Sequence, residues 1–380
     1  MDLTARLYIW RAPRSVCSRA SKAARAARGG FLIAPRLERM PAGASNLSRI
    51  KRRKPLGSAI IRIVLLTSAL ALAIGAPQLR AEPATPIKGT AYVTSWFGGV
   101  VSVIDLASGA LKKKIPVGIH NHNVTLRPDQ KQAWVTNNNA GTLSIIDTQA
   151  NSVIKALPTG KGPRHTFFSA DGKEAYVTNE FDDRVEIFDT QAGASLGVVK
   201  VGSMPHFALA SGDRLFVSNF GGGDVTVLSR AKRQALATIA VGTGPLGQGA
   251  TKDGKRVYVA CHNANLVAVI DAESLRRIAD IETDAGPVQV TVAPNQSFAY
   301  VANDGAGTVQ KIDLAVNKVV KTLSIAPDAG SHGVGFAGDG RWLLITNTGG
   351  NSLSIFDTQT DEIVKTISVP TAPEGVAVRR

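Results

Sequence analysis

The stretch AYVTNEFDDRVEIFD at residues 175–189 decides the fold. It begins as a short strand rich in residues that favour β-structure, passes through a polar loop, and returns as a second strand that ends on an aspartate. Similar stretches begin at Ala91, Ala133, Leu215, Val257, Ala299 and Leu343. The seven starting points follow one another at 42, 42, 40, 42, 42 and 44 residues. A nearly constant period of this length predicts a propeller or a solenoid.

Each repeat has room for four short strands. In the third repeat these are HTFFSA at 165–170, the YVT strand, RVEIFD at 184–189 and GVVKV at 197–201. No stretch after residue 87 shows a sustained helical period of apolar residues. Four antiparallel strands form one blade of a propeller. The sequence therefore predicts an all-β fold, a seven-bladed β-propeller with four-stranded antiparallel blades.

The two ends of the repeat array complement each other. The first repeat lacks an innermost strand, whereas GVAVRR at 375–380 is an innermost strand with no repeat after it. Pairing the C-terminal strand with the first blade would close the ring and remove an open sheet edge. We expect the propeller to span residues 89–380, after a short linker at 82–88.

The segment AYVTN at 175–179 is the signature of a known family. Over about residues 87–380 the chain resembles the YVTN family of seven-bladed, periplasmic β-propellers. Similar propellers include periplasmic binding proteins, lactonases, amine dehydrogenase subunits, haem d1 domains and the copper domain of nitrous oxide reductases. The motif describes strand packing, so the resemblance implies the fold and leaves the function open.

The basic residues are concentrated before the repeats. Residues 1–81 hold 16 lysines and arginines and 2 acidic residues, which leaves 28 basic and 27 acidic residues of the totals of 44 and 29. A basic run at 49–62 precedes an apolar run at 63–76 and a small-residue site ending at Ala81, as in a cleavable secretory signal. We predict that residues 1–81 are a leader removed on export to the periplasm.

Several features of the leader stay open. An uncleaved membrane anchor is an alternative, although 14 apolar residues are few for a bilayer span. Met1 or Met40 can be the true start, and residues 1–39 are expected to be disordered or not translated. Export can follow the Sec or the twin-arginine route. The nearly neutral remainder predicts no specific nucleic-acid binding. We also expect a monomer that has no membrane attachment after cleavage.

Cysteines and most aspartates are predicted to be structural. Leader removal leaves Cys261 as a single thiol, which favours packing over a soft metal ligand. Ten aspartates recur at turns, where such side chains accept backbone N–H bonds. They are Asp105, Asp129, Asp147, Asp171, Asp189, Asp253, Asp271, Asp313, Asp339 and Asp357.

All six histidines fall in segments predicted to share one face of the propeller. They are His120, His122, His165, His206, His262 and His332. Aligning the repeats gives one column of His122, Arg164, His206, Leu246, Val288, His332 and Glu374. The next column is Asn123, His165, Phe207, Gly247, Gln289, Gly333 and Gly375. Rotational symmetry predicts that these positions ring the mouth of the central channel, where they can meet one small ligand.

A further column follows the second strand of each repeat. The residue type at this position differs from repeat to repeat, whereas the positions around it are similar in each repeat. This indicates either functional specialisation or an exposed position that packing does not constrain. Its members are Trp96, Asn138, Glu180, Phe220, His262, Asp304 and Thr348.

Three functions fit these columns. The leading hypothesis is a non-catalytic protein that binds a small molecule or a protein partner through this rim. The proposed ligand-binding residues are His122, Arg164, His165, His206, His332, Glu374, Trp96, Glu180, Phe220 and His262.

The second is a metal- or haem-dependent redox or accessory propeller, with a divalent transition metal held by His122, His206, His332 and Glu374. No CxxCH motif attaches haem covalently. The third is a lactonase or lyase in which histidine and arginine polarise a carbonyl and Glu374 acts as the base.

Overall fold

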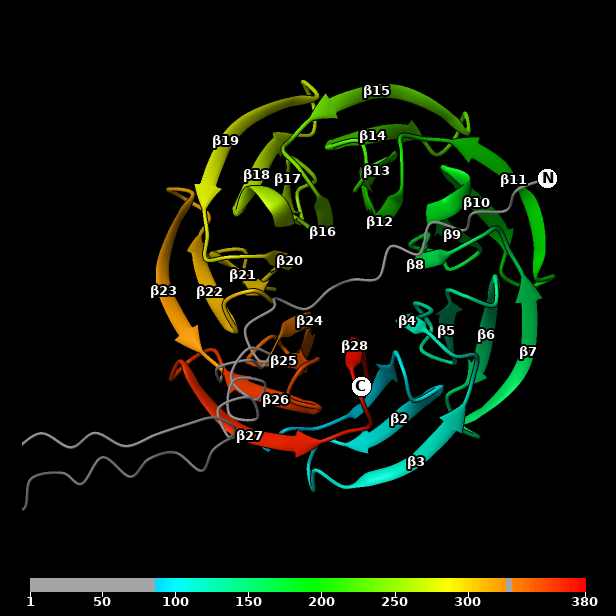
Figure 1. The fold of residues 1–380 in the computed structure, drawn as a ribbon, viewed down its shortest axis with the longest axis vertical. Coiled ribbons are helices and arrows are strands. Elements are labelled where there is room, and N and C mark those ends of the chain that lie inside the picture. The colour runs from blue at the N-terminus through cyan, green and yellow to red at the C-terminus, as the bar shows by residue number, and fades with distance from the viewer. Residues whose placement is uncertain (1–85, 326–329) are drawn as a thin grey trace, which may run out of the picture. The chain divides into compact units, whose positions relative to one another are not determined.

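Seven sheets stand in a ring in the computed structural model, which describes residues 86–325 and 330–380 (Figure 1). Each sheet has four antiparallel strands, and six of the sheets are made of four consecutive strands. The remaining sheet has the order β28-β1-β2-β3. We call this sheet blade 1 and number the others in chain order. The arrangement confirms the predicted seven-bladed β-propeller.

The strand bounds follow the repeat. The innermost strands are β4 (Asn121–Leu126), β8 (Pro163–Phe168), β12 (Pro205–Ser211), β16 (Pro245–Ala250), β20 (Pro287–Val292), β24 (Ser331–Ala337) and β28 (Pro373–Arg379). The second strands are β1 (Thr90–Ser95), β5 (Gln132–Asn137), β9 (Glu174–Asn179), β13 (Arg214–Asn219), β17 (Arg256–Cys261), β21 (Phe298–Asn303) and β25 (Trp342–Asn347).

The outer half of each blade is equally regular. The third strands are β2 (Val100–Asp105), β6 (Thr142–Asp147), β10 (Arg184–Asp189), β14 (Asp224–Ser229), β18 (Leu266–Asp271), β22 (Thr308–Asp313) and β26 (Ser352–Asp357). The outermost strands are β3 (Leu111–Pro116), β7 (Ser152–Pro158), β11 (Ala194–Lys200), β15 (Gln234–Ala240), β19 (Arg276–Glu282), β23 (Lys318–Ser324) and β27 (Glu362–Ser368).

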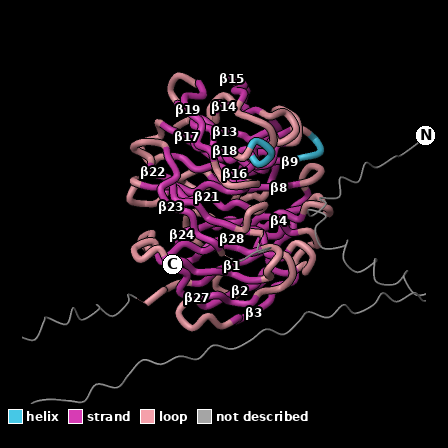
Figure 2. The backbone as a smooth tube through the Cα atoms, turned by 60° about the vertical axis from the view of Figure 1, so that its left-hand side comes forward, coloured by secondary structure: helices cyan, strands magenta, loops and turns pink. Residues whose placement is uncertain are grey.

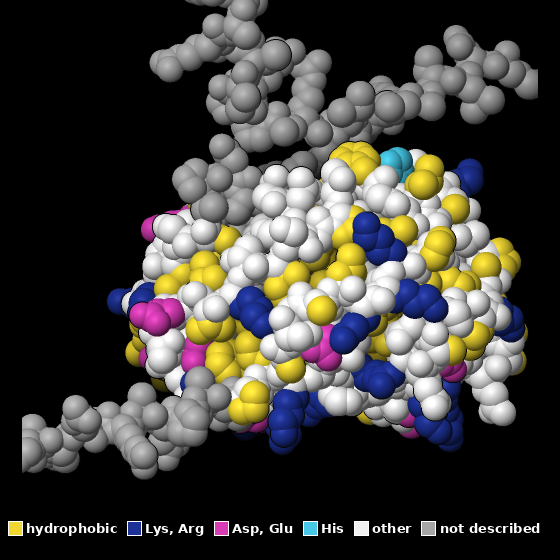
Figure 3. Space-filling view, turned by 90° about the horizontal axis from the view of Figure 1, so that it is seen from below, with side chains coloured by type: hydrophobic (Ala, Val, Ile, Leu, Met, Phe, Trp, Pro, Cys, Tyr) yellow, Lys and Arg dark blue, Asp and Glu magenta, His cyan; other side chains and the backbone are white. Residues whose placement is uncertain are grey.

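Helix is confined to two short turns in the described residues, η1 (Glu180–Asp182) and η2 (His262–Ala264) (Figure 2). Among residues 86–325 and 330–380, no helix has the length and apolar character needed to cross a bilayer. Lysine, arginine and hydrophobic side chains are interspersed over the wall seen in Figure 3. The predicted leader and most of the linker lie outside the described residues, so their boundaries stay predictions.

The hydrophobic core lies in layers between neighbouring blades. Between blades 1 and 2, Tyr92 packs in one cluster with Ile115 and Val135, and all three are buried. The Tyr92 hydroxyl donates to the carbonyl of Thr148 (3.1 Å) and to Oδ1 of Asn151 (2.7 Å), both in blade 2. A fully buried large side chain contributes about 2 kcal/mol. The tyrosine of the YVT motif therefore joins one blade to the next.

The asparagine at the end of the second strand holds the blade hairpin together. Asn137 Nδ2 donates to Thr142 Oγ1 (3.1 Å) and Ser144 Oγ (2.9 Å), both on the third strand. Asn347 makes the equivalent pair of bonds in blade 7. Blade 5 has Cys261 at this position, where burial raises the thiol pKa to about 12. That thiol is fully buried beside apolar residues, as predicted for a packing residue.

The recurrent aspartates are confirmed as turn residues. Asp129 Oδ1 accepts the N–H of Lys131 (3.0 Å), and Asp147 Oδ1 accepts the N–H groups of Gln149 (2.9 Å) and Ala150 (2.7 Å). All ten predicted aspartates accept at least one such backbone bond. They satisfy local N–H groups that the turns would otherwise leave without partners.

Ring closure joins the two ends of the array. Strand β28 pairs antiparallel with β1, and Tyr92 lies opposite Ala377 in the register. Gly89 has a φ of 115° and approaches the Arg379 carbonyl so closely that a Cβ would lie 2.7 Å from its oxygen. The predicted closure by the C-terminal strand is confirmed, and the last strand of the sequence becomes the innermost strand of blade 1.

Deleting residues 373–379 should abolish cooperative unfolding, because the deletion removes the inner strand of blade 1 and leaves the β1 edge unpaired. Thermal unfolding followed by circular dichroism measures this. A circular permutant that links residue 380 to residue 89 and opens within 118–120 keeps every strand, so it should unfold cooperatively. A deletion variant that unfolds like the intact protein would contradict the closure.

Candidate functional site

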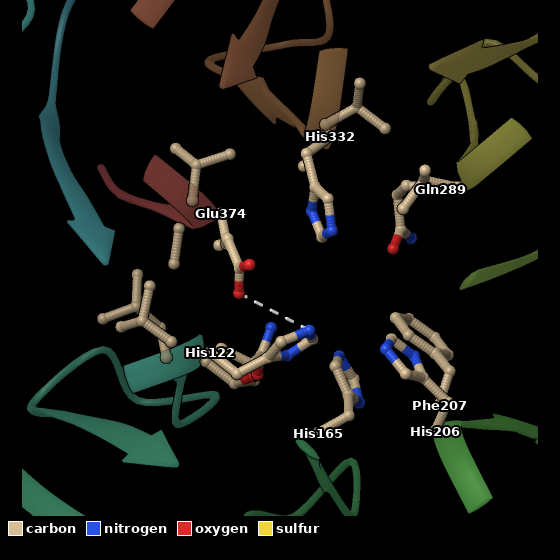
Figure 4. A pocket seen from close by; sticks show the side chains of 17 residues that line it. His122, His165, His206, Phe207, Gln289, His332 and Glu374 are labelled. Atoms are coloured by element: carbon tan, nitrogen blue, oxygen red, sulfur yellow. Dashed lines mark hydrogen bonds and ion pairs between the residues drawn. The ribbon is translucent and has the colours of Figure 1, made fainter. Parts of the chain in front are cut away.

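The innermost strands of six blades surround a cavity of about 230 Å³. Its polar lining residues are His122, Asn123, Thr125, His165, His206, Gln289, His332 and Glu374. Apolar side chains that include Phe207 and Val288 complete the lining. Figure 4 shows the histidine rings, the Gln289 amide and the Glu374 carboxyl group pointing toward a common centre. Members of both predicted columns therefore line one cavity, whereas the column residues Arg164, Leu246 and Gly247 do not.

A threonine hydroxyl joins neighbouring blades beside this cavity. Thr178, on the second strand of blade 3, accepts a hydrogen bond from the His165 N–H (3.0 Å) and donates to the His206 carbonyl in blade 4 (2.8 Å). Three further threonines make the same pair of backbone contacts: Thr94 donates to His122, Thr136 to Arg164 and Thr346 to Glu374. Each hydroxyl satisfies two buried backbone groups and fixes adjacent inner strands.

The bridging hydroxyl changes on the other side of the ring. The equivalent residues of blades 4, 5 and 6 are Ser218, Ala260 and Ala302. The column residues that follow them are Leu246, Val288 and His332. Four of the five polar column residues thus follow a bridging threonine, and His332 is the exception. The bridging threonines therefore position four of the polar column residues, whereas Gln289 and His332 line the cavity without such a bridge.

His122 makes the densest set of polar contacts. Its Nδ1 lies 3.1 Å from the Arg164 carbonyl oxygen, and its Nε2 lies 3.6 Å from Oε2 of Glu374. A carbonyl oxygen only accepts, so a hydrogen bond here places the proton on Nδ1 and leaves Nε2 as an acceptor. The His122 ring stands edge-on to His206 and His332, with centroid separations of 4.9 and 5.9 Å.

Three buried polar atoms at the cavity have no hydrogen-bond partner among the described residues. They are Nδ1 of His165, Nδ1 of His206 and Oε2 of Glu374. His165 is 8% exposed and stacks on Phe207 with ring centroids 3.7 Å apart, and His206 is 9% exposed. An unsatisfied buried polar group costs about 1–3 kcal/mol. Such atoms around one cavity indicate that a ligand or water supplies their partners.

Burial keeps the cavity histidines uncharged near neutral pH. It lowers the pKa of His165 to about 3. It also lowers the pKa of His332 to about 4, with the charge of Arg164 acting in the same direction. Burial first and Arg164 second hold the pKa values of His122 and His206 well below their ordinary range. Each neutral imidazole carries one donor and one acceptor nitrogen, and the donor of His122 already faces the Arg164 carbonyl.

Glu374 responds to burial in the opposite direction. Burial raises its pKa to about 8, and the charge of Arg164 offsets part of that rise. The carboxyl group is therefore protonated near pH 7, so its contact with His122 joins two neutral groups rather than an ion pair. Burial also raises the pKa of Asp304, in blade 6, to about 6.

Arg164 joins two residues of the varied column. Its Nε lies 2.5 Å from Oε2 of Glu180, which is 4% exposed, and its Cζ lies 5.3 Å from the centroid of the Trp96 ring. Trp96 stacks in turn on His120, with centroids 4.8 Å apart. Arg164 belongs to blade 3 and Trp96 to blade 1, so the contact crosses the intervening blade 2.

The structure brings most of the predicted site residues together. Five line the cavity: His122, His165, His206, His332 and Glu374. Arg164, Trp96 and Glu180 form the adjoining cluster. Phe220 and His262 do not line the cavity, and their binding role stays a prediction. Asn123, Phe207 and Gln289 do line it. The site prediction omits these three, although the aligned repeats place them in the column beside His122.

The four side chains of the metal hypothesis line one cavity, but they are not arranged as the ligands of a metal ion. Within the described ranges, no group of three or more His, Cys, Asp or Glu side chains is arranged to hold a metal ion. A metal bound by His122, His206, His332 and Glu374 would have to draw these groups closer together. The metal therefore stays a prediction.

The ring of seven four-stranded blades around a polar cavity defines a seven-bladed β-propeller with a candidate binding site on its axis. Two family models match the chain. The model described as "Lactonase, 7-bladed beta-propeller" matches residues 92–274, and the YNCE-like beta-propeller model matches residues 282–380. Together they place the chain among the seven-bladed β-propeller proteins. No curated protein matches the sequence.

Solved structures share the fold at low sequence identity. A hydrazine synthase from Kuenenia stuttgartiensis has a TM-score of 0.64 and 18% identity, and the match covers 68% of this chain and 95% of that one. A functionally unknown protein from Desulfotomaculum acetoxidans has a TM-score of 0.67 and 16% identity, covering 77% and 99%. The dihydro-heme d1 dehydrogenase NirN, in complex with DHE, has a TM-score of 0.60 and 16% identity, covering 79% and 77%.

The raised pKa of Glu374 predicts that stability declines as the pH rises from about 4.5 to about 8, which we call the alkaline limb of the stability profile. The folded protein holds this proton up to about pH 8, whereas an ordinary glutamate loses it near pH 4.5. The linked stability is fully present below about pH 4.5 and is lost as the pH rises through 8, by an amount on the order of a few kcal/mol. Glu374→Gln should flatten this decline in urea unfolding measured from pH 5 to 9.

The buried histidines change the stability of the fold with pH in the opposite direction to Glu374. The lowered pKa values of His165 and His332 stabilise the fold above about pH 6.5, and this contribution is lost as the pH falls toward 4 and 3. Glu374→Gln should therefore keep the acid limb. Glu273→Gln, at an exposed glutamate, is the matched control and should keep both limbs. An unchanged alkaline limb in Glu374→Gln would show that Glu374 ionises in its ordinary range.

Proposed function

We propose that this protein binds a small hydrogen-bonding molecule in the cavity on the propeller axis. The observation that carries this proposal is the set of buried polar atoms without partners that face one cavity. Nδ1 of His165, Nδ1 of His206 and Oε2 of Glu374 form this set. Leaving several such atoms unsatisfied is costly, so a site that gathers them is suited to a ligand that completes their hydrogen bonds.

The size and lining of the cavity restrict the kinds of ligand that can bind. About 230 Å³ is less than the roughly 300–1,000 Å³ of pockets that bury drug-sized molecules. Neutral imidazoles, the Gln289 amide and a protonated carboxyl group suit hydroxyl and carbonyl groups. Phe207 and Val288 offer apolar surface to a carbon skeleton. A ligand of the size of a monosaccharide, a sugar lactone or a short hydroxy acid fits these features.

A second candidate function is the ring opening of a lactone. The family model that matches residues 92–274 is named for lactonases, and the matched range contains His122. The unprotonated His122 Nε2 would take a proton from water as that water adds to the lactone carbonyl carbon. The ring C–O bond then breaks, and the protonated Glu374, 3.6 Å from His122, would give its proton to the departing ring oxygen. The product is the open hydroxy acid.

The family and the cellular location complete the proposal. We assign the chain to the YVTN-type propellers, because the threonine and asparagine of that motif make the recurrent contacts described above. We also infer export to the periplasm from the basic and apolar runs before residue 82. The haem- and metal-dependent alternatives remain outcomes of the binding test.

Thermal shift screening of small sugars, sugar lactones and hydroxy acids should find stabilising ligands, and isothermal calorimetry should then give one site per chain. His165→Leu and His206→Leu should each weaken a hit about tenfold or more, because each removes a hydrogen bond inside a buried site. His262→Leu is the matched control, because His262 does not line the cavity. Its affinity should stay within about threefold of the unaltered protein.

Other outcomes decide between the candidates. Equal affinities in all three histidine variants would contradict binding in this cavity. Conversion of a bound lactone by the unaltered protein and not by Glu374→Gln would favour catalysis. Stoichiometric uptake of Zn²⁺ or Cu²⁺, lost in the His122→Ala, His332→Ala double variant, would favour the metal site. A spectral shift of added haem, lost in the same double variant, would favour a haem site.

The exported protein should begin near Glu82, because a small-residue cleavage site ends at Ala81. N-terminal sequencing of protein recovered from the periplasmic fraction measures this directly. Ala81→Phe should block cleavage and leave the longer form attached to the membrane, whereas Ala84→Phe, beyond the site, should not. Recovery of the full-length chain from the cytoplasm would contradict export.

A further inference from the structure

We propose that the ligand of this cavity carries an anionic group, a carboxylate or a comparable oxoanion, and that Arg164 binds that group. This inference rests on the proposed function and adds the charge of the ligand to it. It is carried by the way in which Glu180 and Trp96 hold the guanidinium beside the cavity.

The guanidinium is held through one of its three nitrogens. Nε of Arg164 donates to Glu180 at 2.5 Å. No hydrogen bond from either Nη group to a residue in the described ranges accompanies it. Guanidinium groups bind carboxylates best through two parallel N–H bonds. Contact through Nε alone leaves the two Nη groups available for such a bidentate bond.

Trp96 limits the movement of this cation. The Arg164 Cζ lies 5.3 Å from the centroid of the Trp96 ring, within the range of a cation–π contact. Stacking on an aromatic face and a bond to a buried carboxylate together orient a guanidinium before a ligand arrives. A preoriented side chain loses less entropy on binding, which raises affinity.

The backbone of Arg164 is fixed in the ring of cavity residues. Its carbonyl accepts hydrogen bonds from Thr136 Oγ1 (2.8 Å) and lies 3.1 Å from His122 Nδ1. Its column equivalents His122 and His206 line the cavity. The longer Arg164 side chain extends from the same ring position to Glu180 and Trp96 and does not itself line the cavity. The Trp96 ring lies edge-on to the cavity residue His122, with centroids 5.9 Å apart, so the guanidinium adjoins the cavity.

The electrostatic reach of Arg164 supports this position. It is the first charged group to act on the pKa values of His122, His206, His332 and Glu374. These four residues come from four different blades. A protonated Glu374 and neutral imidazoles add no negative charge. The carboxylates near this space are Glu180, which pairs with Arg164, and Asp304, whose charge acts on Glu374.

Calorimetry with a matched pair of probes tests the proposal. D-gluconate and D-glucose have similar size and hydrogen-bonding groups, and only gluconate is charged at pH 7. The unaltered protein should bind gluconate at least tenfold more tightly than glucose. Arg164→Met should remove this preference by weakening gluconate about tenfold or more while changing glucose less than threefold.

Two further variants separate recognition from folding. Arg184→Met removes an arginine of the same blade that pairs with Asp182 and does not line the cavity, so both affinities should be kept. Glu180→Gln keeps an amide oxygen that can accept the Arg164 Nε–H, so the guanidinium stays oriented, while the negative charge that competes with the ligand is removed. It should strengthen gluconate binding about threefold, whereas a purely structural role of Glu180 would weaken both probes.

The possible results distinguish a failure of this inference from a failure of the proposed function. If glucose binds and gluconate is no tighter, or if Arg164→Met leaves their ratio unchanged, the anionic group is refuted and the cavity remains a binding site for neutral molecules. If neither probe nor any member of the wider ligand screen binds, the proposed function itself fails. Arg164→Met leaves the buried Glu180 unpaired and should lower the melting temperature, but it should still unfold cooperatively and well above the temperature of the calorimetry, which excludes unfolding as the cause.

Discussion

The hydroxyl that bridges two inner strands is the interaction on which the rest of this molecule depends. A propeller blade presents backbone groups toward the axis that its own sheet cannot satisfy. The Thr178 hydroxyl accepts a hydrogen bond from the His165 N–H and donates one to the His206 carbonyl, so one side chain satisfies backbone groups in two blades. These two hydrogen bonds hold adjacent inner strands at a fixed distance from each other. The cavity is the space that the inner strands enclose.

This constraint also explains why the site is one-sided. The bridge is made in blades 7, 1, 2 and 3, and the residues that it positions are Glu374, His122, Arg164 and His206. Blades 5 and 6 have alanine instead, and the column residues that follow are Val288 and His332. A repeated fold has thereby become an asymmetric site, in which a bridging hydroxyl fixes the inner strands on one side only.

The electrostatics of the site follow from the same burial. Neutral histidines and a protonated Glu374 avoid the high cost of isolated buried charges. The guanidinium of Arg164 pairs with Glu180 and lies over the Trp96 ring. The site therefore combines an uncharged hydrogen-bonding cavity with one paired cation at its edge, an arrangement suited to a polar molecule with a charged end.

The sequence by itself determined the fold and the ring of candidate residues. A period near 42 residues specifies repeated sheets, and rotational symmetry carries equal repeat positions, such as His122 and His206, to equal places around one axis. Only the tertiary structure decided which side chains share a cavity. Phe220 and Glu180 occupy the same column, yet only Glu180 reaches Arg164, and the Arg164–Trp96 contact joins blades separated by another. Repeat symmetry positions backbones, whereas side-chain contacts depend on length, charge and neighbours that differ from blade to blade.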